Sequence, residues 1–226
     1  MRAPEPRRVR TRAGELAVVE AGDPRAPAVL LLHGSSASSA TWAAYVPVLA
    51  PSFRVLVPDL LLGGDPDAPG GAPPDLEARA SQVEELLERL SAVDPAAVGH
   101  GSGGGVAAVL AARGRVRTLV LVGASGVDDR VAGELGRREV PTLLVWGEED
   151  RVVPVAEAER LQDRIPTAAL AVLPGCGHLV TEDAAPTVAT LLVEFLRSRH
   201  LGARHSHAPA GPVMLSLERR PPREDR

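Results

Sequence analysis

The sequence predicts an α/β fold, a mostly parallel sheet with helices on both faces, and three observations predict it. Short apolar segments alternate with segments of helical period from about residue 28 to residue 199, as in chains of βαβ units. The apolar segments are continuous rather than alternating, which indicates strands that are buried on both faces. A length of 226 residues with 45% hydrophobic residues suits one domain with a sizeable core.

The expected elements follow in chain order. Residues 9–20 predict two strands that turn at Ala13 and Gly14. Further strands are expected at residues 28–32, 54–57, 96–98, 117–122, 142–146 and 169–173, and helices at 39–49, from Asp75 as N-cap, at 104–113, 155–165 and 186–199. Residues 66–74, which are rich in Pro, Gly and Asp, are expected to form a loop. We expect one domain over residues 1–200 and a disordered tail over 201–226.

The composition argues against several classes of protein. The net charge of −4 and the lack of an arginine cluster in the folded part argue against nucleic-acid binding. A single cysteine, Cys176, excludes an internal disulfide framework and favours a reducing compartment, so a cytoplasmic location is expected. Residues 1–12 lack the apolar run of a signal peptide, and no stretch of about 18 apolar residues predicts a membrane span.

The most informative stretch is residues 98–105, which read Val-Gly-His-Gly-Ser-Gly-Gly-Gly between an apolar run and an Ala-rich segment. This is the pattern of a nucleophile elbow, G-x-S-x-G, a sharp turn from strand to helix. Two registers are open. Centred on Gly101, the elbow has small neighbours at Gly99 and Gly103 but no nucleophile. Centred on Ser102, it has a nucleophile, but His100 stands where a small residue is needed.

Two more polar side chains follow later strands. Asp150 comes after the strand at 142–146, and His178 comes after the strand at 169–173. Because the active groups of an open parallel sheet lie at the carboxyl ends of its strands, we expect both to meet the elbow. The chain order of elbow, acid and histidine is the order that one class of serine hydrolases uses.

Further motifs accompany this order: L-L-H-G at residues 31–34 with Trp42 downstream, V-P-D at 57–59, G-H-x-x-G-G at 99–104, L-V-L-V-G at 119–123, W-G-x-x-D-x-V-V-P at 146–154 and G-C-G-H at 175–178. Together they resemble the α/β-hydrolase superfamily, over about residues 9–199. The resemblance implies an α/β-hydrolase fold and a serine hydrolase that cleaves an ester or thioester of a small molecule.

The resemblance also implies a role for each matched residue. His178 is the general base, Asp150 orients it, and Ser102 is the nucleophile. The backbone N–H groups of Ser35 and of the residue after the nucleophile, Gly103, form the oxyanion hole, where Gly34 leaves room for substrate. We expect no cofactor and no metal, and we expect the histidines near the C-terminus, His200, His205 and His207, to be solvated.

Competing assignments stay open. Asp128 or Asp129 is an alternative acid, and Ser125 and Cys176 are weaker candidate nucleophiles. Taken by itself, Asp150 could also be an ordinary loop acid or an ion-pair partner. His33 is expected to shape its loop and His100 to be packed. The alternative function is a hydrolase-fold protein without a nucleophile, with Gly101 at the elbow. Such a protein would act as a histidine-based lyase or isomerase, as a binding module or as a pseudoenzyme.

The segment between the strands at 117–122 and 142–146 is short. Only residues 127–139 are available there, so no helical cap is expected over the site. The site is then open, or covered by a second subunit in a homodimer. Residues 60–62, three leucines, are an apolar lip of this mouth or are buried.

Overall fold

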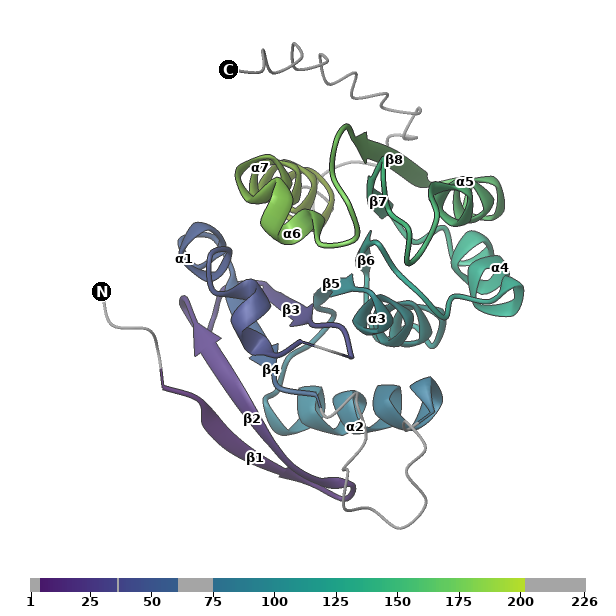
Figure 1. Cartoon of the computed structure of the whole chain (residues 1–226). Helices are drawn as coiled ribbons and strands as arrows, with labels where there is room; N and C mark the ends of the chain where they lie inside the picture. The colour runs from purple at the N-terminus through teal and green to yellow at the C-terminus, as the bar shows by residue number, and fades with distance from the viewer. Residues whose placement is uncertain (1–4, 36, 61–74, 202–226) are drawn as a thin grey trace, which may run out of the picture.

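The computed structural model describes residues 5–35, 37–60 and 75–201, which form one eight-stranded sheet between two layers of helices (Figure 1). The strands are β1 (Arg7–Thr11), β2 (Gly14–Ala21), β3 (Ala28–Leu32), β4 (Arg54–Pro58), β5 (Ala96–His100), β6 (Thr118–Val122), β7 (Thr142–Gly147) and β8 (Ala168–Leu173). Their order in the sheet is β1-β2-β4-β3-β5-β6-β7-β8. β2 pairs antiparallel with β1 and β4, and β3 to β8 are parallel, so the predicted fold class is confirmed.

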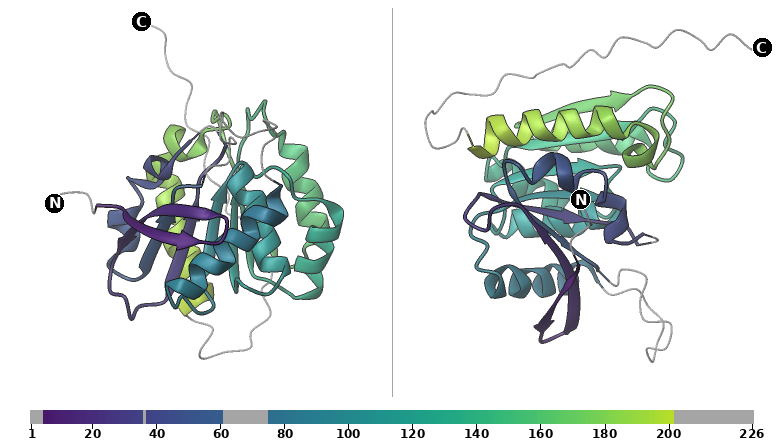
Figure 2. Two further views of the ribbon diagram at one scale, coloured as in Figure 1. Left: turned by 90° about the horizontal axis from the view of Figure 1, so that it is seen from below. Right: turned by 90° about the vertical axis from the view of Figure 1, so that its left-hand side faces the viewer.

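The helices divide between the two faces of the sheet. They are η1 (Ser39–Trp42), α1 (Val46–Leu49), α2 (Leu76–Arg89), α3 (Ser102–Ala112), α4 (Asp129–Arg137), α5 (Val155–Arg164), α6 (Val180–Asp183), α7 (Ala185–Leu196) and η2 (Arg197–Leu201). Helices α2 to α5 cover one face, and α1, α6 and α7 cover the other (Figures 1 and 2). Every residue of β3 to β7 is buried, as their unbroken apolar runs predict.

Two of the predicted helices differ clearly from the prediction, and two observed helices, α4 and α6, are not among the predicted elements. The helix expected at 39–49 is broken into η1, which Ser38 caps, and the short α1, which begins anew with Pro47 in its first turn. Helix α3 begins at Ser102, two residues before the expected start, because the turn from β5 needs only one residue, Gly101. A run of glycines locally favours a loop over a helix. In the structure, packing nevertheless places most of this run inside α3.

Residues 127–139 form one helix, α4, which Asp128 caps through a 2.7 Å hydrogen bond from the N–H of Val131. Helix α4 lies beside α3 and α5 in the helical layer and not across the strand ends (Figure 1). The expectation that this segment makes no cap is therefore confirmed. Leu60 is buried. Leu61 and Leu62, the loop at 66–74 and the tail at 202–226 lie outside the described residues.

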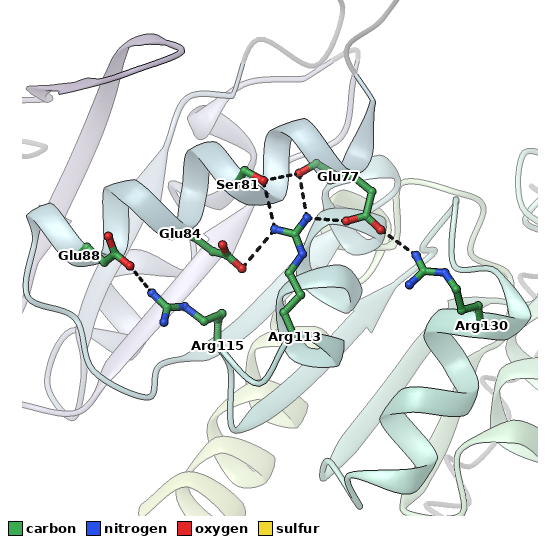
Figure 3. Close-up of polar contacts among 7 residues, drawn as sticks. All are labelled: Glu77, Ser81, Glu84, Glu88, Arg113, Arg115 and Arg130. Carbon is green, nitrogen blue, oxygen red and sulfur yellow. Dashed lines mark hydrogen bonds and ion pairs between the residues drawn. The ribbon is translucent and has the colours of Figure 1, made fainter.

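Arginine–glutamate pairs join α2 to its neighbours in this layer (Figure 3). The carboxylate of Glu77 on α2 accepts hydrogen bonds from Arg113 at 2.5 Å and from Arg130 on α4 at 2.7 Å, and these contacts lower the pKa of Glu77. Glu88 similarly accepts from Arg115. These groups are partly exposed, so each pair contributes little by itself, on the order of 0–1 kcal/mol. No described helix has the length and apolar character that crossing a membrane requires.

Candidate active site

The elbow between β5 and α3 is centred on Gly101. Its backbone angles are φ 55° and ψ −126°, a conformation that side chains strain and glycine adopts freely. The turn is closed on both sides by backbone hydrogen bonds. The N–H of Gly101 donates to Val122 at 3.0 Å, and its carbonyl accepts from Gly104 at 3.0 Å and from Ser125 at 2.9 Å.

The packing around the neighbouring glycines decides this register. A Cβ atom on Gly99 would lie 2.4 Å from the carbonyl oxygen of Gly103, and one on Gly103 would lie 2.4 Å from the carbonyl oxygen of His33. Positions 99 and 103 therefore have no room for a side chain. A Cβ atom on Gly101 would meet nothing closer than 3.6 Å. The two crowded positions lie two residues before and two residues after the uncrowded one, as an elbow centred on Gly101 requires.

Ser102 therefore does not lie at the top of the turn, contrary to the register that made it the nucleophile. It is the first residue of α3, and its hydroxyl is buried and hydrogen-bonds to no described residue, His178 included. The physical reason is steric, because centring the turn on Ser102 would put His100 where the elbow has no space. The residue after the centre is then Ser102, not Gly103, and Gly103 packs against the His33 loop.

The structure brings Asp150 and His178 together at the carboxyl ends of β7 and β8. The Asp150 Oδ2 atom lies 2.8 Å from Nδ1 of His178, and the Asp150 side chain is fully buried. Because the carboxylate accepts, Nδ1 carries the proton and Nε2 is left as an acceptor. Nε2 lies 3.6 Å from where a Cβ atom of residue 101 would stand. The imidazole therefore presents a basic nitrogen to the top of the elbow.

The loop that carries Asp150 is held at several points. The Oδ1 atom of Asp150 accepts from the N–H groups of Val152 at 2.9 Å and Val153 at 2.8 Å. The indole N–H of Trp146 donates to the carbonyl of Val153 at 2.8 Å. The W-G-x-x-D-x-V-V-P motif thus forms a turn that several hydrogen bonds hold. In this turn Asp150 accepts from two backbone N–H groups and also hydrogen-bonds to His178.

The Asp150 loop is also joined to the loop that carries His178. The N–H of Glu149 donates to the carbonyl of Cys176 at 2.8 Å. A Cβ atom on Gly147 would lie 2.2 Å from the carbonyl oxygen of Gly177, so only glycine permits this approach of the two backbones. This contact explains why a glycine-rich histidine loop still holds His178 in one place.

Two further residues, His100 and Gly123, contact the Asp150–His178 pair. The sequence by itself assigns neither of them such a role. His100, 3% exposed, lies with Nε2 3.0 Å from the carbonyl oxygen of His178, so Nε2 carries a proton and donates it there. Gly123 at the end of β6 lies under both members, because its Cβ atom would stand 3.3 Å from Asp150 Oδ2 and from His178 Nδ1. No local pattern in the sequence signals either contact.

We expect acid to destabilise the native protein more than a His100→Gln variant. Burial lowers the pKa of His100 below its unfolded value of about 6.5. As the pH falls through that value, the unfolded chain binds a proton that the folded chain does not, so the free energy of unfolding decreases. Urea titrations of both proteins at pH about 7.5 and about 5.5 measure the effect. The neighbouring groups Asp150, His178 and Glu182 are present in both proteins, so the two proteins differ only at position 100. An equal decrease in the free energy of unfolding in both would therefore contradict this prediction.

The loop after β3 forms the other side of the site. Nε2 of His33 accepts the N–H of Leu60 at 2.8 Å, so Nδ1 carries the proton and donates to the carbonyl of Gly34 at 2.8 Å. His33 thus shapes the loop, as expected. The Cα atom of Gly34 lies 3.7 Å from the Cβ position of residue 101. In the described part of the chain, the N–H groups of Ser35 and Ser102 donate to no backbone carbonyl.

The alternative residues have other partners. Asp128 caps α4, and Asp129 binds Arg160 at 2.5 Å and Arg164 at 3.0 Å, so neither carboxylate serves His178. Cys176 is buried, and burial together with Asp183 and Glu149 raises the pKa of its thiol, which disfavours a reactive thiolate. Among the described residues, no three histidine, cysteine or acidic side chains gather as a metal site.

Comparisons with known proteins agree with this fold. Residues 27–134 and 127–185 match the family model described as the alpha/beta hydrolase fold. The 2-hydroxymuconate semialdehyde hydrolase of Pseudomonas sp. (strain CF600) is 25% identical over 243 residues, which cover 74% of this chain and 86% of that protein. This alignment is longer than the chain itself, so the relative carries residues that the chain lacks.

Solved structures share the fold. A membrane phospholipase A, described as a bacterial virulence factor, superposes with a TM-score of 0.78 and 20% identity over 90% of this chain and 88% of that chain. A meta-cleavage product hydrolase from Pseudomonas fluorescens IP01 superposes with a TM-score of 0.75 and 20% identity over 86% of this chain and 98% of that chain. At this identity the likeness concerns the fold alone.

Proposed function

Because the chain belongs to the α/β-hydrolase fold family, we propose that it is a hydrolase in which the Asp150–His178 pair activates water directly, without a covalent serine intermediate. One observation carries the proposal: Gly101 tops the elbow and faces Nε2 of His178, with the Cβ position 3.6 Å away. The hydrogen bond between Asp150 and His178 supports a base with an orienting acid, whereas residue 101, a glycine, offers no nucleophilic side chain. The substrate is a small ester or thioester.

Glycine at position 101 leaves the space that a serine side chain would fill. That space is about the size of one water molecule, on the order of 30 Å³. A water there lies within hydrogen-bond reach of Nε2, the atom that accepts a proton in general-base catalysis. Ordinary serine hydrolases place a hydroxyl at this point, and water supplies the same O–H group.

The chemistry then proceeds in two steps. Nε2 of His178 removes a proton from water while the water oxygen bonds to the acyl carbon, and Asp150 stabilises the imidazolium. The N–H groups of Ser35 and Ser102 are the candidate donors to the oxyanion, the latter at the N-terminus of α3, where the helix dipole favours negative charge. The bond to the leaving alcohol or thiol breaks, and His178 returns the proton to the leaving group.

Two observations weigh against the covalent mechanism through Ser102. The Ser102 hydroxyl is buried without a partner, and the tight contacts at Gly99 and Gly103 hold the elbow in the other register. The named relatives, a semialdehyde hydrolase and a phospholipase, differ in substrate. The semialdehyde hydrolase, a relative by sequence, supports hydrolysis as the reaction type, and the two names do not single out one substrate.

We expect the native protein to hydrolyse p-nitrophenyl acetate faster than buffer, and a His178→Ala variant to lose about 10²–10⁴-fold of that rate. A Ser102→Ala variant, which keeps the backbone N–H, should retain it, and a fluorophosphonate probe should not label the native protein. Loss of activity in Ser102→Ala together with labelling would show a serine enzyme. A native rate equal to that of His178→Ala would refute hydrolysis by the pair.

A further inference from the structure

Two of the exposed large apolar residues lie next to the candidate site along the chain. Among the described residues four are exposed, namely Val48, Val93, Val152 and Leu179. Two of the four adjoin the Asp150–His178 pair: Val152 is 70% exposed and Leu179 is 46% exposed. Single apolar residues on a surface need no explanation, so it is the position of these two, one near each member of the pair, that bears on the site.

The backbone of both residues is held close to the pair. The N–H of Val152 donates to Oδ1 of Asp150 at 2.9 Å, within the turn that Trp146 secures. Leu179 directly follows His178 and precedes α6, whose first residue, Val180, is fully buried. The two residues therefore stand on the anchored backbone that holds the base and the acid, and not on a separate loop.

The polar surroundings of these two residues are mostly acidic. Glu148 and Glu149 are exposed on the Asp150 loop, and Glu182 and Asp183 are exposed on helix α6, which follows Leu179. One exposed arginine, Arg151, stands against these four acids. Asp183 accepts the N–H of Gly177 at 2.9 Å, and Glu148 accepts that of Gly175 at 3.4 Å, so two of these carboxylates lie directly against the histidine loop. This charge disfavours an anionic ligand and favours a neutral one.

We propose that Val152 and Leu179 form an apolar rim that binds the alkyl part of a neutral carbonyl ligand, whose carbonyl end lies at Gly101 and His178. The inference rests on the proposed function, which places the reactive group at that point, and it names the substrate class as neutral esters or thioesters with an alkyl chain. Helix α4 lies in the helical layer rather than over the strand ends, so the rim takes the place of a cap in contacting the chain.

Binding of methyl ketones to the native protein tests the rim without any catalysis, because ketones present a carbonyl group and are not hydrolysed. The probes are methyl butyl, methyl hexyl and methyl octyl ketone, titrated by calorimetry. We expect the affinity to rise about twofold per added methylene, less than the fourfold of full burial at about 0.8 kcal/mol, since the rim is open on one side.

Val152→Ser and Leu179→Ser should each weaken binding of the longest ketone by about fivefold and that of the shortest by less than twofold. The matched control is Val93→Ser, because Val93 is 80% exposed but precedes β5, at the opposite end of the strands. It should change none of the affinities. Circular dichroism checks that each variant is folded.

Three results would overturn the rim. The first is no binding of any ketone, and the second is a chain-length dependence that both site variants leave intact. The third is a native dimer in sedimentation that Leu179→Ser dissociates, which would make these side chains a contact between two copies. Failure of the proposed function is a separate result: ketone binding with the expected variants, but no hydrolysis by the native protein, retains the rim and rejects the water mechanism.

Discussion

A Gly101→Ser variant is expected to become a covalent esterase. Its Cβ atom would stand 3.6 Å from Nε2 of His178 and 3.7 Å from Cα of Gly34, which are ordinary contacts, so the hydroxyl comes within hydrogen-bond reach of the base. Oδ2 of Asp150 already lies 2.8 Å from Nδ1 of His178. We expect p-nitrophenyl acetate hydrolysis to rise at least about a hundredfold over the native protein, because a nucleophile and its base act as one unit.

A Gly101→Ala variant is the matched control for this gain. It carries the same strain of a Cβ atom at φ 55°, about 1–3 kcal/mol, but offers no nucleophile. Only the serine variant should react with a fluorophosphonate, and adding His178→Ala to it should remove both labelling and activity. If both position-101 variants fold and the serine variant remains unlabelled, the pair does not activate a group at this point.

The second large effect concerns stability. Gly103→Ala is expected to lower the free energy of unfolding by about 3 kcal/mol, because the new Cβ atom would lie 2.4 Å from the His33 carbonyl oxygen and 2.6 Å from that of Leu32. Both are backbone atoms, which cannot turn aside as a flexible side chain does. The helix must then move off the loop that carries Gly34 and Ser35.

Gly133→Ala in α4 is the control for this prediction. Gly133 also lies within a helix, but its Cβ atom would meet only the end of Arg137, at 3.7 Å. Alanine there should raise the free energy of unfolding by about 0.5–1 kcal/mol, the ordinary gain in helix propensity. Urea unfolding of the two variants against the native protein measures both changes. Similar effects at positions 103 and 133 would show that crowding at the elbow is not what requires glycine.

Much of the architecture could be predicted from the sequence alone. The continuous apolar run of β3 and the pattern of α2, with its Asp75 cap, are local features, and the structure has them at the expected places. The order of elbow, Asp150 and His178 along the chain, combined with the rule that parallel strands share one carboxyl edge, placed these residues in one region. The prediction of one helix over residues 39–49 was wrong, because a second helix begins there with Pro47 in its first turn.

The choice of acid was favoured by the sequence and explained by the fold. Asp128, Asp129 and Asp150 all follow strands, and only the W-G-x-x-D spacing at residues 146–150 favours Asp150, without a physical reason for its contact with a histidine 28 positions downstream. The structure distinguishes them by contact. Asp128 caps a helix and Asp129 pairs with arginines, whereas the Gly147–Gly177 approach brings the Asp150 loop against His178.

The sequence by itself determined a parallel α/β sheet, a site at its carboxyl edge and a glycine-rich elbow with two possible centres. Only the tertiary structure decided between Gly101 and Ser102. Within residues 99–105 the local preferences of the two registers are nearly equal, since glycine accepts almost any backbone angle. The decision came from contacts with distant segments: Gly103 packs on the loop after β3, and the carbonyl of Gly101 accepts from Ser125 beyond β6. Those contacts leave Nε2 of His178 facing a residue without a side chain.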